Sequence, residues 1–320
     1  MASPLIVVTR PVPEKALELL RPRGTVRVGP SEPPVPTADE VADLVRDAEI
    51  VFTLPANPLT GGAIRGASKL RMIATMGTGY DNVDVGAARE RGIPVTFAPG
   101  ILDETTADGI FALMLATARR LPEAERFLRA GKYRGWTPFL FLGTDVYEAT
   151  LGVVGMGRIG RAMARRATGF RMKILYTDAF RNESAEEELG ARFVTLDELL
   201  AQSDFVTLHV PLMPETRHLI DAKRLRRMKK TAILINGSRG PVVDERALAE
   251  ALRDGVIAAA GLDVFEREPQ VEPALLELEN AVLLPHIASA SERTRVRMAV
   301  RAAENILAFL DKRPLLDPVP

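Results

Sequence analysis

Leu151-Gly-Val-Val-Gly-Met-Gly-Arg-Ile-Gly160 reads as a strand, a tight turn and the start of a helix. A Cβ at Gly155 would obstruct the turn, and one at Gly160 would push the helix off the strand. At Gly157 a Cβ would hold a phosphate away from the backbone, whereas the free N–H groups at the helix start attract that anion. The stretch therefore predicts a turn that binds the pyrophosphate of a dinucleotide. The residues predicted to line it are Gly155, Met156, Gly157, Arg158, Ile159 and Gly160.

The residues that follow supply the context that such a turn needs. A second apolar run ends in Asp178, eighteen residues after Gly160, which is the spacing of a strand–helix–strand unit. An acid at this place accepts hydrogen bonds from the adenosine ribose and repels a 2′-phosphate, so NAD is favoured. Arg181 could partly offset that repulsion, which leaves NADP as a secondary cofactor. The alternative is a glycine turn that only packs a helix on a strand.

Length and composition are those of a globular protein with room for two domains. The chain has 320 residues with 42 basic and 42 acidic ones, a balance that argues against a dedicated nucleic-acid surface. It has no cysteine, which excludes disulfides and cysteine-type zinc sites, and we expect no metal site. The basic run at residues 223–230 is interpreted as the solvated face of a helix. With no signal-peptide or membrane-span pattern, we expect a cytoplasmic protein that does not bind membranes.

Strands and helices alternate in two series, which predicts an α/β fold of two parallel-sheet domains covered on both faces. Residues 1–100 carry the first series, with strands predicted at 4–9, 25–28, 49–54, 71–74 and 94–96. In this series Thr37 and Glu40 read as a capping box. Residues 150–285 carry the second series, with strands predicted at 150–154, 173–177, 192–194, 204–208, 232–235, 257–262 and 281–284. Long helices are expected at 103–121 and 289–310, so the chain crosses to the second domain and returns to the first.

The carboxyl ends of the predicted strands are where ligands bind in such sheets. In the second series these ends carry Asp178, His209-Val210-Pro211, Asn236–Gly240, Asp263 and His286. In the first series, residues 77–82 form a glycine-rich turn after a strand. Its small residues would let backbone N–H groups approach a small anion, but an ordinary turn between strand and helix is an equal alternative.

Three histidines limit the search for a proton donor that works near neutral pH. His218 is expected at the surface or at a helix start. His209 ends a strand, where a structural role is favoured over ligand contact. His286 follows a strand and precedes small residues, which favours a functional role.

Reduction of a ketone by a dihydronicotinamide needs a group that holds the substrate's anionic end. Arg239 lies on a Gly-Ser-Arg-Gly turn, and its guanidinium fork suits a carboxylate. A carboxylate beside the catalytic histidine would stabilise its imidazolium form. Glu266 and Glu268 both qualify, and the residues alone leave that choice open.

Together with the glycine turn, Arg239, Glu268 and His286 resemble the D-isomer-specific 2-hydroxyacid dehydrogenase family. The closest resemblance is to its glyoxylate/hydroxypyruvate reductase branch, through residues 116–122 and Gly135-Trp136. Several motifs that agree in order are a stronger signal than any one of them. The matching segments are residues 77–82, 151–160, 209–218, 234–244, 261–269 and 284–289.

The resemblance implies a role for each site residue. His286 would protonate the keto oxygen, Glu268 would pair with His286, and Arg239 would bind the carboxylate and carbonyl oxygen of the substrate. Backbone N–H groups near Thr78 and Gly79 would complete the carboxylate site. The remaining cofactor contacts that it implies are Val210, Pro211, Thr216, Asn236, Ser238 and Asp263, the last beside the nicotinamide carboxamide.

The resemblance also implies an architecture and an activity. Two flavodoxin/Rossmann-like domains are expected, with a dinucleotide-binding domain (residues 101–287) inserted into a substrate-binding domain (1–100 plus 288–320). Residues 103–143 would form the dimerisation arm of a homodimer. The expected reaction is NAD(P)H-dependent reduction of glyoxylate or hydroxypyruvate to the D-2-hydroxy acid. The alternatives are the same chemistry on phosphite, 3-phosphoglycerate or 2-ketogluconate, and an NADH-sensing, corepressor-like binding protein.

The sequence departs from the family pattern at one point near Arg239. The segment Asn236-Gly-Ser-Arg often reads Asn-Thr-Ala-Arg or Asn-Val-Ala-Arg in the family. Gly237 is expected to add backbone freedom beside Arg239, which affects the rigidity of the arginine and not its role.

Overall fold

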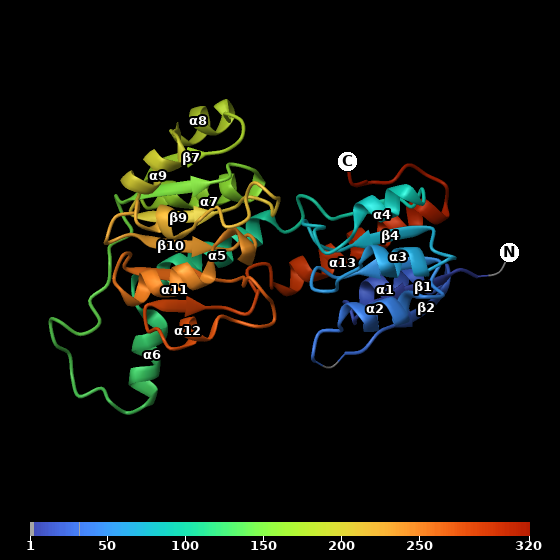
Figure 1. The fold of residues 1–320 in the computed structure, drawn as a ribbon, viewed down its shortest axis with the longest axis horizontal. Coiled ribbons are helices and arrows are strands. Elements are labelled where there is room, and N and C mark those ends of the chain that lie inside the picture. The colour runs from blue at the N-terminus through green and yellow to red at the C-terminus, as the bar shows by residue number, and fades with distance from the viewer. Residues whose placement is uncertain (1–2, 32) are drawn as a thin grey trace. The chain divides into compact units, whose positions relative to one another are not determined.

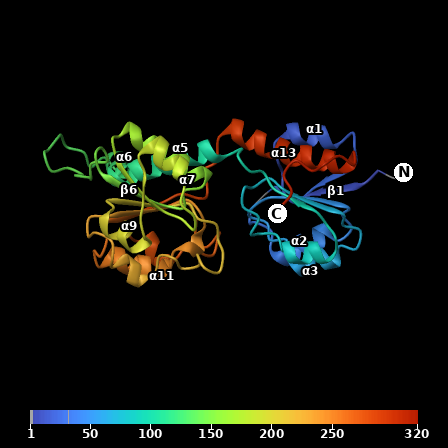
Figure 2. The ribbon, with the colours of Figure 1, turned by 90° about the horizontal axis from the view of Figure 1, so that it is seen from above.

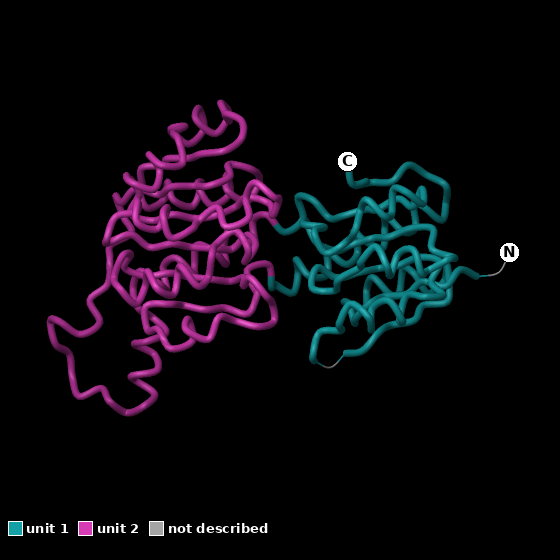
Figure 3. Tube along the Cα trace, viewed as in Figure 1, with its two compact units in different colours: residues 1–102, 290–320 teal, residues 103–289 magenta. Residues whose placement is uncertain are grey.

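The computed structural model describes residues 3–31 and 33–320. The chain forms two compact units, which are coloured separately in Figure 3. Unit 1 comprises Met1–Leu102 and Ala290–Pro320, and unit 2 is the continuous segment Asp103–Ser289. Unit 2 is therefore inserted into unit 1, and both boundaries lie two residues later than the sequence predicted.

Unit 1 is built on a five-stranded parallel sheet in the order β2-β1-β3-β4-β5, the order of a flavodoxin-like fold. Helices α1 and α13 cover one face, whereas α2 and α3 cover the other (Figure 2). The strands are β1 (Leu5–Val8), β2 (Thr25–Val28), β3 (Ile50–Thr53), β4 (Met72–Thr75) and β5 (Val95–Thr96). The helices are α1 (Glu14–Leu20), α2 (Ala38–Val45), α3 (Gly61–Gly66), α4 (Val85–Glu90) and α13 (Glu292–Leu310).

Unit 2 is built on a seven-stranded parallel sheet in the order β12-β11-β10-β9-β6-β7-β8. The order reverses between β6 and β9, which creates the switch point where doubly wound folds bind their ligands. The strands, seen in Figure 1, are β6 (Thr150–Val154), β7 (Lys173–Thr177), β8 (Arg192–Phe193), β9 (Phe205–Leu208), β10 (Ile233–Asn236), β11 (Ala259–Leu262) and β12 (Ala281–Leu283).

Helices cover both faces of the unit 2 sheet and enclose two apolar cores. Helices α5 and α7 pack on one face, and α9 and α11 on the other (Figure 2). The helices of this unit are α5 (Asp103–Ala118), α6 (Leu121–Arg129), α7 (Arg158–Gly169), α8 (Glu183–Leu189), α9 (Leu196–Gln202), α10 (Ala222–Leu225), the 3₁₀ turn η1 (Gly240–Val242), α11 (Glu245–Arg253) and α12 (Pro273–Leu276).

All twelve predicted strands are present, and the helix ends differ from prediction for identifiable reasons. The helix expected to reach residue 121 stops at Ala118, because Arg120 adopts a left-handed φ of 52° that separates α5 from α6. Helix α13 begins at Glu292, where Ser291 caps it by accepting the N–H of Thr294 at 3.3 Å. The predicted capping box of Thr37 and Glu40 is formed at the start of α2.

The basic run at residues 223–230 differs from the solvated helix face that was expected. Helix α10 covers only Ala222–Leu225, and the chain then turns. Lys229 forms an ion pair of 2.7 Å with Asp204, and Arg227 one of 3.5 Å with Asp197. These two cations are therefore held by unit 2 carboxylates.

Within residues 3–31 and 33–320, no helix combines the length and apolar character needed to cross a membrane. The cytoplasmic location stays a prediction from the sequence.

The contact between α7 and β6 depends on Gly160. A Cβ on this residue would lie 2.0 Å from the carbonyl oxygen of Gly155, a backbone atom that cannot rotate away. We expect Gly160→Ala to lower the free energy of unfolding of unit 2 by about 1–3 kcal/mol, as overpacking does.

Gly169 at the far end of the same helix is the matched control, because nothing lies within 4 Å of a Cβ placed there. Gly169→Ala should raise the same free energy by about 0.4–1 kcal/mol by restricting the unfolded chain. Far-UV circular dichroism during urea unfolding measures both variants. Equal stability of the two would contradict the packing argument.

Candidate active site

The predicted site residues of unit 2 lie on loops that leave the carboxyl ends of neighbouring parallel strands. The glycine turn follows β6, Asp178 follows β7, and His209 follows β9. Arg239 and His286 lie in the segments that follow β10 and β12. Because the strands are parallel, these loops emerge at one edge of the sheet.

The glycine turn has the geometry that a dinucleotide requires. Gly155 adopts a φ of 95°, and its added Cβ would lie 2.9 Å from the carbonyl carbon of His209, across the switch point. Gly157 is the N-cap of α7, and a Cβ placed there would meet nothing within 4 Å. The turn therefore offers an open approach to the start of a twelve-residue helix, whose N–H groups suit a pyrophosphate.

The loop after β7 is fastened to this turn through both backbone groups of Met156. Asp178 accepts the N–H of Met156 at 2.7 Å and that of Ala179 at 2.7 Å. Asn182 donates its amide N–H to the carbonyl oxygen of Met156 at 2.9 Å. The Asp178 carboxylate is thus oriented beside the turn, where its remaining lone pairs suit the hydroxyls of a ribose. The residues present fit NAD.

The loop after β9 is closed by Thr216. Its hydroxyl donates to the carbonyl oxygen of Pro211 at 2.6 Å and accepts the N–H of Met213 at 2.8 Å. Thr216 is buried, whereas Val210 and Pro211 are more exposed at the sheet edge. Among the predicted cofactor residues of this loop, Thr216 therefore closes the loop from a buried position, and Val210 and Pro211 remain accessible.

His209 lies at the base of the same loop and bonds within its own segment. Its Nε2 atom is 2.9 Å from the hydroxyl of Thr207. Burial lowers the pKa of His209 to about 4, so the ring is neutral at physiological pH. This geometry agrees with the structural role that the sequence favoured.

Asn236 organises the turn that carries Arg239. Its amide oxygen accepts the N–H of Ser238 at 3.1 Å and the hydroxyl of Ser238 at 3.0 Å. Its amide nitrogen donates to the carbonyl oxygen of Arg239 at 3.0 Å. Asn236 is buried, so the predicted cofactor residues Asn236 and Ser238 hold the arginine's backbone through these bonds.

Close packing explains why residue 237 is a glycine, which the sequence alone did not explain. A Cβ at Gly237 would lie 1.8 Å from Cδ1 of Ile110, which is fully buried in α5. The glycine makes room for this side chain from a distant helix. The turn beside Arg239 is thus packed against α5, in place of the looseness that was expected.

Gly240 brings the Arg239 turn into contact with the loop that carries Glu268. A Cβ at Gly240 would lie 1.9 Å from the carbonyl carbon and oxygen of Phe265. The two backbones therefore touch, and a larger residue would separate them. The Arg239 charge is close enough to be one of the groups that lower the pKa of Glu268.

Glu268 is the carboxylate that pairs with His286. Its Oε2 atom is 2.9 Å from Nδ1 of His286, and its Oε1 atom accepts the N–H of Phe265 at 3.0 Å. Burial alone would raise the pKa of Glu268. The bond to His286, the charges of His286 and Arg239, and the Phe265 N–H outweigh burial, and the net pKa is lowered. Glu268 is therefore an anion at neutral pH, and the imidazole Nε2 points away from it.

Asp263 fastens the segment that follows His286. Its two carboxylate oxygens accept the N–H groups of Ile287 at 2.7 Å and Ala288 at 2.8 Å. The residue is only 1 % exposed, and burial raises its pKa although both N–H groups oppose that shift. A contact between Asp263 and a nicotinamide stays a prediction.

Glu266, the other candidate carboxylate, faces a different histidine. Its Oε1 atom is 2.8 Å from Nε2 of His218 and 3.3 Å from a guanidinium nitrogen of Arg217. His218 has a φ of 48° and lies in a turn before α10, which is capped by Asp221, so His218 does not begin a helix.

The sequence analysis missed Glu245, a buried carboxylate in the first turn of α11. It accepts the backbone N–H of Glu266 and so holds one end of the Glu268 loop. Burial raises the pKa of Glu245. A glutamate just after the N-cap residue Asp244 reads as an exposed helix start, so the pattern carried no signal of this burial.

Unit 1 carries the predicted Thr78–Gly79 turn at the carboxyl end of β4. The hydroxyl of Thr78 donates to the carbonyl oxygen of Ala98 at 3.0 Å. A Cβ at the preceding Gly77 would lie 2.7 Å from Cγ of Pro55. The turn is thus firmly packed within its own unit, and its binding of a carboxylate stays a prediction.

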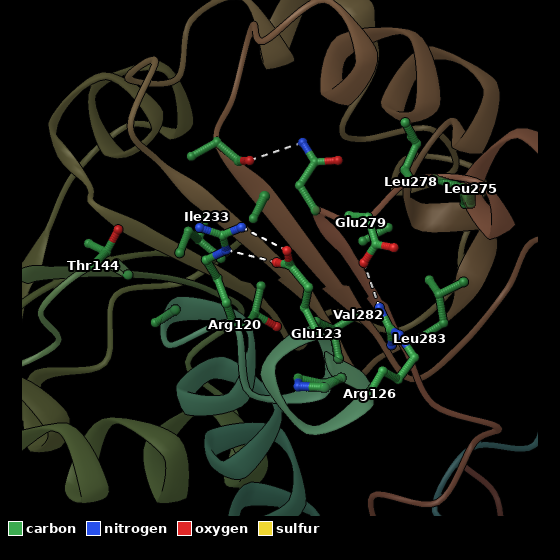
Figure 4. Close-up of a pocket in the computed structure, with 18 of the residues that line it drawn as sticks. Arg120, Glu123, Arg126, Thr144, Ile233, Leu275, Leu278, Glu279, Val282 and Leu283 are labelled. Carbon is green, nitrogen blue, oxygen red and sulfur yellow. Dashed lines mark hydrogen bonds and ion pairs between the residues drawn. The ribbon is translucent and has the colours of Figure 1, made fainter. Parts of the chain in front are cut away.

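A hollow of about 790 Å³ lies away from these loops (Figure 4). Its lining includes Ile233 and Ala281, which begin β10 and β12, and residues of α5 and α6. None of the predicted site residues lines this hollow. In the described part of the chain, no cluster of three His, Cys, Asp or Glu residues is arranged to hold a metal ion.

Comparison with known proteins agrees with this geometry. Residues 111–288 match the family described as D-isomer specific 2-hydroxyacid dehydrogenase, NAD binding domain. A glyoxylate reductase of Korarchaeum cryptofilum (strain OPF8) is 52% identical over 309 residues, covering 96% of this chain and 93% of that protein.

Solved structures of related proteins match this fold over nearly the whole chain. A protein of Thermus thermophilus has a TM-score of 0.91 at 44% identity, covering 99% of this chain and 100% of its own. An NADPH-dependent glyoxylate/hydroxypyruvate reductase of Sinorhizobium meliloti, solved with NADP and malonate, has a TM-score of 0.87 at 36% identity, covering 99% and 97%.

The chain belongs to the D-isomer specific 2-hydroxyacid dehydrogenases. It is an oxidoreductase, and unit 2 contains its NAD-binding domain.

His209 should make the stability of unit 2 depend on pH. The native pKa of His209 is about 4, below the ordinary value of 6.5. Between these two pH values His209 is protonated in the unfolded chain and neutral in the native chain. As pH falls from about 6.5 to 4, the free energy of unfolding should fall by about 3 kcal/mol from this group alone. Urea unfolding at pH 7.5 and pH 4.5, followed by circular dichroism, measures the change.

His209→Gln should lose less stability than the wild type between these two pH values, because glutamine does not titrate. An identical loss in both proteins would show that burial of His209 contributes nothing to the pH dependence.

Proposed function

We propose that this protein reduces glyoxylate or hydroxypyruvate to the D-2-hydroxy acid with NADH. The observation that carries the proposal is the Glu268–His286 pair beside the Arg239 turn, at the same sheet edge as the glycine turn. The glyoxylate reductase of Korarchaeum cryptofilum, 52% identical to this chain, supports the substrate class.

Arg239 is proposed to bind the substrate's carboxylate and carbonyl oxygen. Its backbone is held by Asn236, and its turn packs against the Glu268 loop through Gly240. A guanidinium fork donates two parallel hydrogen bonds to a carboxylate, which fixes the orientation of the neighbouring carbonyl.

His286 is proposed to protonate the keto oxygen. Its Nδ1 atom faces Glu268, so the Nε2 proton is the one available for transfer. The ring remains 42% exposed, which leaves that atom accessible. Because Glu268 is ionised at neutral pH, it favours the imidazolium form that donates a proton.

The glycine turn and Asp178 are proposed to hold the pyrophosphate and the adenosine ribose of the cofactor. When bound, the dihydronicotinamide supplies the hydride that reduces the carbonyl carbon. The side chain of Asp178 favours NADH over NADPH, and NADPH is proposed as a secondary cofactor.

Absorbance at 340 nm tests the proposal directly, with NADH or NADPH and each of glyoxylate, hydroxypyruvate, pyruvate and 2-ketogluconate. Rapid NADH consumption with glyoxylate or hydroxypyruvate is expected. Bound NADH without turnover of any keto acid would contradict the proposal and favour a different substrate such as phosphite, or a binding protein that senses NADH.

His286→Ala should lower kcat for glyoxylate by about a thousandfold, within the range that a general acid contributes. NADH binding, followed by its fluorescence, should be unchanged, because His286 lies after β12 and not on the glycine turn. His218→Gln is the matched control and should stay within about threefold of the wild type.

Glu268→Gln should lower kcat for glyoxylate, because Nδ1 of His286 then loses the carboxylate that orients its ring. Near-wild-type turnover of His286→Ala would refute the assignment of the proton donor.

We also propose that the protein is a homodimer held by the exposed part of the expected arm at residues 103–143, since α5 at its start is packed into the core of unit 2. Helix α6 has no buried residue, and the following loop extends away from the body of unit 2 (Figure 1). Trp136 is 80% and Phe139 81% exposed, an apolar surface that is rarely left in water. The hollow of Figure 4 adds an apolar wall beside α6 that includes Leu275, Val282 and Leu283. A second copy of the chain is the occupant proposed for both surfaces.

The double variant Trp136→Ser, Phe139→Ser should shift the solution mass from two chains toward one. Size-exclusion chromatography with light scattering measures this mass. Phe180→Ser is the control, since Phe180 is 83% exposed but lies outside the segment. A wild type that runs as a monomer, or a double variant that stays dimeric, would contradict this role.

A further inference from the structure

The loop between Asp178 and Asn182 contains one cation, Arg181, and that cation is already bound. Its Nε atom donates to Oε1 of Glu186 at 2.9 Å, and its Nη2 atom donates to Oε2 at 2.6 Å. Both carboxylate oxygens thus face the guanidinium in the paired geometry that arginine and carboxylate prefer. Glu186 lies on α8 and is only 18% exposed, whereas Arg181 is 61% exposed.

A second interaction holds the carboxylate in place. The hydroxyl of Tyr176 donates to Oε1 of Glu186 at 2.7 Å and accepts the N–H of Asn182 at 2.7 Å. Tyr176 is fully buried in β7, so its ring cannot move with the loop. The hydrogen bonds from Arg181 and Tyr176 lower the pKa of Glu186 to about 2, and it remains an anion throughout the working pH range.

The position of this loop relative to the dinucleotide turn is equally constrained. Asp178 and Asn182, at its two ends, both bond to Met156 within the glycine turn. Arg181 therefore lies on a short segment beside the ribose that Asp178 is placed to bind. In NADP-binding proteins an arginine near this place accommodates the 2′-phosphate. The nearby Arg161 of α7 is paired with Glu188, so it too has its own carboxylate.

We propose that Glu186 is a cofactor-specificity residue, which keeps Arg181 from a 2′-phosphate by holding it in an ion pair braced by Tyr176. Asp178 disfavours the 2′-phosphate by repulsion, and Glu186 removes the cation that would compensate. The preference for NADH thus depends on two carboxylates with different tasks. This inference rests on the proposed use of NADH, and it adds a residue that acts through Arg181.

The test compares two ligands that differ only in the 2′-phosphate, adenosine 5′-monophosphate and adenosine 2′,5′-bisphosphate. Isothermal titration of the full chain measures both dissociation constants. Glu186→Gln should tighten bisphosphate binding relative to monophosphate by about fivefold, which corresponds to about 1 kcal/mol. In the same variant, the ratio of kcat/KM with NADPH to kcat/KM with NADH should also rise.

Two variants separate this effect from a general change of charge. Glu187→Gln removes one negative charge from an exposed position on the same helix and should leave the ligand ratio unchanged. Adding Arg181→Gln to Glu186→Gln should abolish the gain, because the released guanidinium is then absent.

An equal change of the ligand ratio in Glu186→Gln and Glu187→Gln would overturn the proposal. A tighter bisphosphate binding that persists in the double variant without Arg181 would overturn it too. If Glu186→Gln does not fold, Tyr176→Phe removes the brace on Glu186 together with the acceptor of the Asn182 N–H, and its ligand ratio should move the same way by a smaller factor. An unchanged ratio in that variant would also count against the proposal. These binding measurements need no keto acid, so failure of glyoxylate turnover leaves their outcome intact.

Discussion

The site of this dehydrogenase depends on backbone segments that approach each other more closely than side chains would allow. Gly160 touches Gly155 within the dinucleotide turn, and Gly155 in turn packs against His209 across the switch point of the sheet. Gly240 does the same between the Arg239 turn and Phe265. Each contact is between main-chain atoms, which move only if a whole loop moves. The loops of four strands are therefore positioned by excluded volume before any charged side chain contributes.

Buried polar side chains then fasten these loops to one another. Asp263 binds two N–H groups of the segment after His286, and Glu245 binds one at the start of the Glu268 loop. Burial raises the pKa of both carboxyls, whereas Glu268, which faces a cationic partner, has a lowered pKa. The difference separates two tasks for the same functional group. Asp263 and Glu245 accept backbone N–H groups and hold the loops, whereas Glu268 also bonds to the ring of His286.

Much of this architecture could be predicted from local sequence patterns. Apolar runs indicated the positions of all twelve strands, and the glycine spacing indicated the turn between β6 and α7. What the patterns left open depends on the path of irregular loops. Glu266 and Glu268 are two residues apart, yet one faces His218 and the other His286. The contact of Ile110 with Gly237 joins residues far apart in the chain, and no periodicity encodes it.

The insertion of unit 2 into unit 1 has a consequence for the order of folding during synthesis. Unit 2 is one uninterrupted segment, so its sheet and both helical layers can assemble once residue 289 has left the ribosome. Unit 1 lacks α13 until residues 292–310 are made, and α13 buries Met298, Ala302 and Ile306 on one face of its sheet. The N-terminal part of the chain therefore waits for α13, with only α1 on that face of its sheet. In this protein the order of completed domains is the reverse of the usual N-to-C order of cotranslational folding.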